Sequence, residues 1–256
     1  RRHYGFAFYR STCSAGQRLN LARELAMRVL HVITRMILGG AQENTMLSAI
    51  GQMRLPGLEV ALATGPTTGP EGSLLPLARE QGVKIIEIPE LIRPISPRHD
   101  LVSYYKLKKL FREWQPDIVH THSSKAGILG RLAASAARIP GIVHTIHGLP
   151  FHPYQPKLRN MAYILAERWA ARHCHRIISV CNAMTQQALA VGVGRPEQYA
   201  TIYSGMEMDA FLRRDWNRAE LRSRYHLPDD AFVIGKVARL FELKGHEYLF
   251  QAFAKI

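Results

Sequence analysis

Short apolar runs alternate with amphipathic stretches along most of this chain, and this alternation constrains the fold more than any other feature. The apolar runs predict buried strands, and the stretches between them repeat their apolar residues at helical spacing. We predict strands at 27–33, 58–64, 83–88, 117–121, 141–146, 175–180 and 199–203. Strands that alternate with helices form a parallel sheet with right-handed crossovers and helices on both faces. The sequence therefore predicts an α/β fold with a doubly wound parallel sheet.

Glycine and polar residues stand directly after several of these strands. The segments are Gly39-Gly40, His120-Thr121-His122, His147-Gly148 and Ser204-Gly205. Open parallel sheets bind their ligands beyond the carboxyl ends of the strands. These segments are therefore the candidates for a binding site.

The Gly39-Gly40 pair lies between the first strand and a helix predicted from Ala41 to Met53. Glycine lets a ligand approach the backbone closely, and a helix N-terminus favours negative charge. The segment is not a GxGxxG fingerprint, so it does not predict a dinucleotide site. A plain turn with close helix packing fits the pair equally well.

His120 and His122 share one face of a strand, because alternate residues of a strand point the same way. A metal ion would need a third ligand, for which His144, His147 and His152 are the candidates. No diagnostic spacing connects them, so we predict no metal site and interpret His120 as a hydrogen-bonded histidine at a strand end.

Two further residues at strand ends have both a functional and a structural interpretation. Lys125 opens a predicted helix, where a cation opposes the helix dipole, and this suggests an anionic partner. A solvated lysine fits as well. A neutral His147 could bind a ligand hydroxyl or carry a proton, and a structural histidine fits the spacing equally.

The end of the chain begins a second predicted unit. Residues 206–230 form a polar linker with a helix at 218–225, and a strand at Phe232–Ala238 precedes a helix that follows Gly245. Arg239 and Lys244 flank the turn between them. Arginine binds phosphate oxygens as a fork and lysine as a point charge, so the pair suits a diphosphate. Two solvated charges are the alternative.

The composition indicates an anionic partner without naming it. Lys and Arg number 34 against 20 Asp and Glu, a net charge of +14. Basic helices at 101–114 and 157–173 predict peripheral contact with an anionic membrane, or else solvated faces. No aromatic platform interleaves with these charges, so we expect no nucleic-acid partner. No apolar run is long enough to span a bilayer.

Cysteine use and the first residues bear on the compartment. The three cysteines lack CxxC spacing, which predicts no disulfide framework and favours the cytoplasm. Residues 1–26 are rich in arginine and lack the apolar core of a secretory signal. We interpret them as a disordered or non-native leader and expect Met27 to be the true start.

Six segments together resemble glycosyltransferase family 4, whose members are retaining enzymes with two Rossmann-like domains in the GT-B arrangement. They are MRVLHVITRMILGGAQ, PDIVHTHSSKAGILGRLAA, VHTIHGLPFH, RIISVCNAM, IYSGMEMDAF and IGKVARLFELKGHEYLFQAF. The resemblance implies a Rossmann-like N-terminal domain at 27–205, a linker at 206–230 and a truncated donor-binding domain from 231 to 256. It also implies transfer of a sugar from a nucleotide-sugar donor to a lipid-linked or polysaccharide acceptor, with retention and without a metal cofactor.

The resemblance also implies roles for single residues. His147 matches the family histidine that contacts the transferred sugar, which makes it the candidate catalytic residue. Arg239 and Lys244 match the pair that neutralises the donor diphosphate. The loop of Gly39 and Gly40 would line the inter-domain cleft. The segment that holds His122 and Lys125 would line the acceptor side.

Two departures and two alternatives accompany this resemblance. The two family glutamates that hold the donor are absent from the chain, so we expect it to be inactive as given. Ser204-Gly205 stands where the family often has Asn-Gly. A sugar-nucleotide epimerase with the same fold would need extra carboxylates, and the first domain shows no clear set. A non-catalytic basic binding module would bind anions in a salt-sensitive manner.

Overall fold

The computed structural model describes residues 26–213, 216–238, 240 and 244–256. The predicted leader therefore lies outside the described residues, apart from Ala26. The chain divides into two compact units, one ending at Met206 and the other running from Glu207 to Ile256. Each unit is described by itself.

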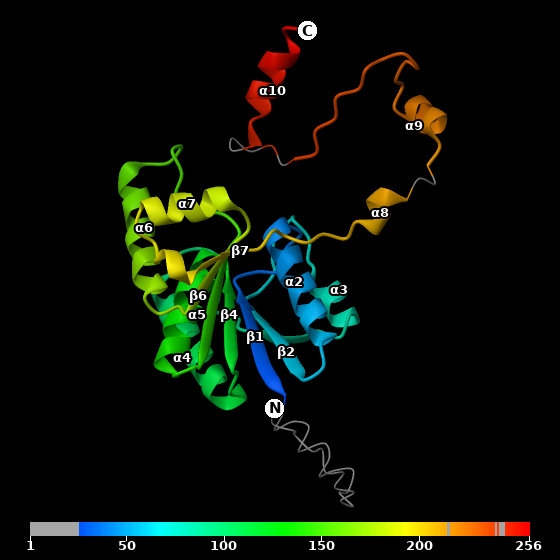
Figure 1. The fold of residues 1–256 in the computed structure, drawn as a ribbon. Coiled ribbons are helices and arrows are strands. Elements are labelled where there is room, and N and C mark those ends of the chain that lie inside the picture. The colour runs from blue at the N-terminus through cyan, green and yellow to red at the C-terminus, as the bar shows by residue number, and fades with distance from the viewer. Residues whose placement is uncertain (1–25, 214–215, 239, 241–243) are drawn as a thin grey trace, which may run out of the picture. The chain divides into compact units, whose positions relative to one another are not determined.

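The first unit is built on one parallel sheet of seven strands (Figure 1). The strands are β1 (Met27–Ile33), β2 (Leu58–Thr64), β3 (Lys84–Glu87), β4 (Ile118–His122), β5 (Gly141–Ile146), β6 (Arg176–Ser179) and β7 (Tyr199–Thr201). Their order across the sheet is β3-β2-β1-β4-β5-β6-β7. This order confirms the predicted Rossmann-like doubly wound fold.

Helices connect the strands. In the first unit they are α2 (Gly40–Met53), α3 (Leu75–Glu80), α4 (Pro97–Trp114), α5 (Ser124–Ala136), α6 (Lys157–Ala171), α7 (Asn182–Ala190) and the short 3-10 helix η1 (Pro196–Gln198). The second unit contains α8 (Asp209–Leu212), α9 (Arg218–Arg224) and α10 (His246–Phe253).

Two apolar cores flank the sheet, because successive side chains of a strand point to opposite faces. The core beneath α2 and α3 contains Val29, Ile33, Met46, Ile50, Leu62 and Leu75. The core beneath α4 and α5 contains Leu30, Val32, Phe111, Val119, Ala126 and Ala133. The central strands are covered on both faces, which explains why their sequences are apolar almost without interruption.

Several helix ends differ from the prediction. α4 begins at Pro97 and not at Leu101, because a proline suits the first helical position. The sequence predicts a helix over 72–81, but α3 begins only at Leu75, since Gly72 has φ +77° and lies outside the helical region. Asn182 is of a residue type that favours the N-cap position, but it is the first residue of α7, and Cys181 is the N-cap.

The strand predicted at Phe232–Ala238 is not formed. The segment has no regular secondary structure, and Phe232 and Val237 are exposed. A strand is stabilised by hydrogen bonds to a neighbouring strand, and within the described part of the second unit no segment pairs with this one. α10 begins after Gly245, as predicted.

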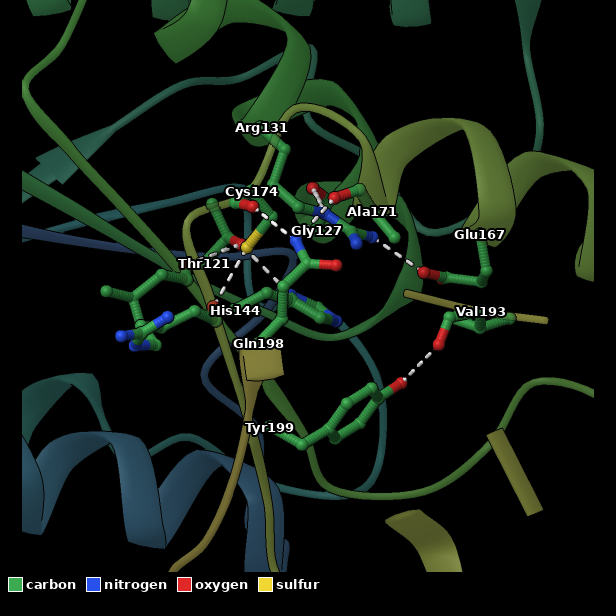
Figure 2. Close-up of polar contacts among 12 residues, drawn as sticks. Thr121, Gly127, Arg131, His144, Glu167, Ala171, Cys174, Val193, Gln198 and Tyr199 are labelled. Carbon is green, nitrogen blue, oxygen red and sulfur yellow. Dashed lines mark hydrogen bonds and ion pairs between the residues drawn. The ribbon is translucent and has the colours of Figure 1, made fainter. Parts of the chain in front are cut away.

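A buried ion pair joins α5 to α6 (Figure 2). Arg131 Nη2 donates to Glu167 Oε2 at 2.7 Å, and its Nε donates to the carbonyl oxygen of Gly127 at 2.7 Å. The two side chains are 0% and 6% exposed. From η1, Gln198 Nε2 donates to the carbonyl oxygens of Ala171 and Cys174. These contacts hold α6 in place on the sheet.

Removing the negative charge of this pair should destabilise the fold, because it leaves a buried guanidinium without a counter-charge. We expect Glu167→Gln to lower the free energy of unfolding by about 3 kcal/mol, measured by denaturant unfolding. The exposed pair of Lys109 and Glu113 supplies the control, and Glu113→Gln should cost less than about 0.5 kcal/mol. Equal losses in the two variants would contradict this account.

Candidate functional site

A cavity of about 640 Å³ lies where the strand order of the sheet reverses. β2 and β3 extend the sheet from one side of β1, whereas β4 to β7 extend it from the other. The cavity is lined by Thr34 and Arg35, which follow β1, and by Ser123 to Lys125, which follow β4. A reversal of this kind is the usual place for a ligand in an open parallel sheet.

Cations dominate the charge of this cavity. Arg35, Arg93, Lys125 and Arg159 line it, and Asp100 is the one carboxylate among the described lining residues. Lys125 Nζ donates to the Asp100 carboxylate and to the carbonyl oxygen of Pro94. This ion pair offsets one positive charge and leaves the cavity cationic.

The arginines of the cavity differ in whether their guanidinium groups already have an ion-pair partner. Arg35 lies 3.8 Å from the Glu71 carboxylate. Arg93 and Arg159 are exposed and have no hydrogen-bond or ion-pair partner in the described part of the chain. Two free guanidinium groups at one cavity suit an anion such as a phosphate or diphosphate.

Ser123 fixes the start of α5 beside the cavity. It is not a glycine and yet has φ +60°, a backbone conformation that costs on the order of 1–3 kcal/mol and is common at functional sites. Its hydroxyl is hydrogen-bonded to Thr34 Oγ1 at 2.8 Å, and Thr34 Oγ1 accepts from the Ala126 amide at 3.2 Å. The end of β1 thereby positions the turn that carries Lys125.

The Gly39-Gly40 pair begins α2 without lining the cavity, although Gln42 does line it. Gly39 has an extended backbone with φ −175°, which any residue can adopt. A Cβ at Gly39 would meet only the flexible end of Gln42, and one at Gly40 would meet nothing within 4 Å. The described chain therefore leaves open space beside Gly40.

Three histidines stack against one another: His31 inside β1, His122 at the end of β4 and His147 just after β5. His31 Nδ1 lies 3.0 Å from His122 Nε2, and His122 Nδ1 lies 3.0 Å from His147 Nε2. At the other end, His31 Nε2 lies 2.8 Å from Gln52 Oε1 of α2. His122 and His147, both predicted site residues, are thus brought together by direct contact.

The sequence analysis did not name His31 as a candidate site residue, although the sequence pattern around it gives an indication. Arg28 and His31 are the two strongly polar residues in the otherwise apolar run MRVLHVI, and the side chain of His31 is completely buried. A buried polar group requires a hydrogen-bond partner. A histidine at the centre of a predicted core strand therefore indicates a polar partner on a neighbouring element.

Burial keeps these imidazoles neutral. Loss of hydration lowers the pKa of His31 to about 4 and that of His147 to about 4. The same cause holds the pKa of His120 and of His122 well below 6.5. On the opposite face, the pKa of His144 is also well below 6.5, first through burial and second through the charge of Arg131.

His31, His120 and His122 also have the mutual spacing of metal ligands, with their nitrogens within 4.8 Å of one another. Their hydrogen bonds already use several of these nitrogens. His31 and His122 are bonded to each other, and His120 Nε2 is bonded to the Thr145 hydroxyl at 2.7 Å. The third histidine of this group is His31. It is not one of the third ligands considered from the sequence, which were His144, His147 and His152.

The remaining predicted histidines lie apart from this cluster. His144 Nδ1 is bonded to Thr121 Oγ1 at 2.9 Å on the other face of the sheet (Figure 2). The His152 backbone amide donates to Asn160 Oδ1 at 3.1 Å in the loop before α6.

The two cations predicted to bind a diphosphate belong to the second unit. Lys244 is exposed, and its carbonyl oxygen accepts a hydrogen bond from Lys236 Nζ. Arg239 lies outside the described residues. Their roles therefore stay predictions.

A family model described as the glycosyl transferase 4-like domain matches residues 39–205. The chain belongs to this family. A curated relative from Escherichia coli, UDP-Gal:alpha-D-GlcNAc-diphosphoundecaprenol alpha-1,3-galactosyltransferase, is 33% identical over 174 residues. That match covers 68% of this chain and 45% of the relative. The chain spans about half the length of the curated relatives it matches.

Solved structures share the fold. A glycosyltransferase from Rickettsia africae ESF-5 matches with a TM-score of 0.65 and 19% identity, over 90% of this chain and 57% of that one. A UDP-GlcNAc 2-epimerase from Methanocaldococcus jannaschii matches with a TM-score of 0.52 and 13% identity, over 69% of this chain and 46% of that one. At these identities the likeness concerns the fold alone. No helix among the described residues has the length and apolar character needed to cross a bilayer.

The buried histidines should make the stability of the fold depend on pH. Their pKa values are lower in the folded chain than in the unfolded one, so the unfolded chain binds protons first as the pH falls. We expect the free energy of unfolding to be greatest above pH 6.5 and to fall towards pH 4, the window set by His31 and His147. Denaturant unfolding at a series of pH values measures this dependence.

The variant His31→Asn serves as the comparison, because it removes one of the buried groups that titrate only on unfolding. Its slope of unfolding free energy against pH should be smaller by up to about one proton. Identical slopes for the variant and the original chain would show that His31 is not held neutral by the fold.

Proposed function

We propose that this chain forms the acceptor-binding part of a retaining glycosyltransferase, which transfers a sugar from a nucleotide-sugar donor to a lipid-linked acceptor or a polysaccharide. The observation that carries the proposal is the cationic cavity at the reversal of the sheet in a chain of this family. The relative from Escherichia coli is named for an acceptor whose sugar is attached to a lipid through a diphosphate. A diphosphate is the kind of group that such a cavity suits.

In this proposal the free arginines bind the acceptor. Arg93 and Arg159 contact the diphosphate, since neither has a partner within the described residues. Lys125 adds positive charge from the start of α5, where Asp100 holds its side chain in place. The open space beside Gly40 leaves room for a ligand to approach α2 closely.

His147 is proposed as the catalytic residue that contacts the transferred sugar. It follows β5, the residue is partly exposed, and its Nε2 is occupied by His122. Nδ1 is the ring nitrogen that remains for a ligand. Because burial lowers its pKa to about 4, the imidazole is neutral at pH 7 and binds a hydroxyl without adding charge.

The departing nucleotide diphosphate is proposed to be stabilised by Arg239 and Lys244. Charge builds on the leaving group in the transition state, and cations held in place stabilise it there more than in the ground state. These side chains supply the positive charge that a metal ion would otherwise supply, so the proposal includes no metal or other cofactor.

The epimerase alternative is less well supported by the same cavity. Moving a proton at a sugar carbon requires acid and base groups placed on the sugar. Asp100 is the one carboxylate among the described residues of the cavity, and Lys125 pairs with it. A binding module without activity remains as the outcome in which anions bind and no sugar is transferred.

An exposed face of α6 supports peripheral contact with an anionic membrane. Leu158, Met161, Leu165 and Trp169 follow one another at helical spacing and are 51–74% exposed. Lys157, Arg168 and Arg172 are exposed along the same helix and its end. An apolar stripe beside basic residues is typical of helices that lie at a membrane surface. We propose that the protein works at the cytoplasmic face of a membrane, close to a lipid-linked acceptor.

Sugar-transfer assays test the proposed roles separately. They use a protein that extends to the full length of the curated relatives. Arg159→Gln should raise the KM for a lipid diphosphate acceptor by about tenfold or more, because it removes one charge-assisted hydrogen bond. Its kcat should change little. Lys244→Ala and His147→Ala should instead lower kcat by about 100-fold, because their contacts strengthen in the transition state.

Arg112→Gln is the matched control for the acceptor site, since Arg112 is an exposed arginine on α4 that does not line the cavity. It should leave both constants unchanged. An acceptor KM that is insensitive to Arg159 would contradict the placement of the acceptor. Salt-sensitive binding of anions without any transfer would favour the binding module.

Membrane contact is tested by flotation with vesicles of anionic and of zwitterionic phospholipid. The chain should float with the anionic vesicles, and Leu165→Gln combined with Met161→Gln should reduce the bound fraction severalfold by removing apolar contact. Lys108→Gln combined with Lys109→Gln removes two positive charges from α4 and should have a smaller effect. A larger loss of binding in the α4 variant would show that α4, and not α6, contacts the membrane, which would contradict the proposal.

A further inference from the structure

Four side chains form one continuous hydrogen-bonded chain that ends at the proposed catalytic histidine. The chain begins at Gln52 on α2, crosses His31 on β1 and His122 on β4, and ends at His147 after β5. Its three contacts measure 2.8, 3.0 and 3.0 Å. His31 and His122 are completely or almost completely buried, so water cannot replace a contact that fails.

The number of N–H groups limits which tautomers the three histidines of this hydrogen-bonded row can adopt. A neutral imidazole has one N–H and one nitrogen with a lone pair. Burial favours the neutral form of all three rings, whose pKa values lie well below neutral pH. Three rings therefore supply three N–H groups for three contacts. If one ring adopted the other tautomer, two N–H groups or two lone pairs would face each other in the interior.

The orientation of the Gln52 amide determines in which direction the hydrogens point, and in the structure the amide oxygen faces His31. This Oε1 atom can only accept, so His31 donates through Nε2 and accepts through Nδ1. His122 must then donate through Nε2 to His31 and accept through Nδ1. His147 completes the chain by donating through Nε2 to His122. Nδ1 of His147 is left with a lone pair and has no partner among the described residues.

We propose that Gln52 is a positioning residue that fixes the tautomer of His147 through His31 and His122. The ring then presents a hydrogen-bond acceptor at Nδ1, so it recognises a ligand group that donates, such as a sugar hydroxyl. This selection of a hydroxyl rests on the proposed function of His147, whereas the fixed tautomer does not. Gln52 acts across three strands without touching the ligand.

His120 provides an internal comparison for this device. Its ring lies against both His31 and His122, with centroid distances of 5.0 and 4.3 Å. Its Nε2 is bonded to the Thr145 hydroxyl and not to a member of the chain. Thr145→Val therefore removes a buried hydrogen bond from the same cluster. It leaves the three hydrogen bonds from Gln52 to His147 in place.

Long-range ¹H–¹⁵N correlation spectra of the ¹⁵N-labelled chain test the proposal directly, because protonated and unprotonated ring nitrogens resonate far apart. We expect His147 to be protonated at Nε2 and unprotonated at Nδ1. Gln52→Met should bring the two ring-nitrogen shifts of His147 closer together, as the two tautomers mix. Gln52→Glu keeps an accepting oxygen and should preserve the original shifts, as should Thr145→Val.

Two results would overturn the proposal: protonation of His147 at Nδ1 in the original chain, or unchanged His147 shifts in Gln52→Met. Gln52 is only half-buried near the end of α2, and preserved amide spectra in the variants establish that they fold. The measurement uses no substrate. Should His147→Ala retain full transfer activity, the proposed catalytic role fails while the tautomer result stands.

Discussion

The parallel pairing of β1 with β4, and of β4 with β5, is the constraint on which the rest of the site depends. It sets His31 opposite His120 and His122 opposite Thr145, so that side chains from separate strands share one face. It also ends the three strands at the same edge of the sheet. The cavity, the turn at Ser123 and the stacked histidines all follow from that shared edge.

The buried polar groups on the two faces of β4 find their partners in different ways. On one face, neutral imidazoles satisfy one another through hydrogen bonds without a buried charge. On the other face, Thr121 contacts His144, and the interior nearby contains the ion pair of Arg131 and Glu167. The free cations stand at the cavity, where water offsets the cost of their charge. Charge available for a ligand is thus kept apart from the charge and polarity that hold the fold together.

Local patterns in the sequence predicted the sheet well, because apolar runs and helical spacing are properties of short segments. Lys125 drew attention for the same reason, as a cation at a helix start, and it lines the cavity. Arg93 and Arg159 were not, since only the crossovers bring a loop before α4 and the first turn of α6 to one cavity. Gln52 and His31 depend likewise on register and side-chain orientation. The strand expected at Phe232–Ala238 was wrong because strand propensity does not supply a pairing partner.

The claim at the centre of this account is that the cavity between the ends of β1 and β4 binds the diphosphate of a lipid-linked acceptor. A crystal structure of the chain with a short-chain prenyl diphosphate sugar tests it most directly. The account predicts the diphosphate between Arg93 and Arg159, within the cavity. A ligand bound elsewhere, with both arginines still facing solvent, would contradict it.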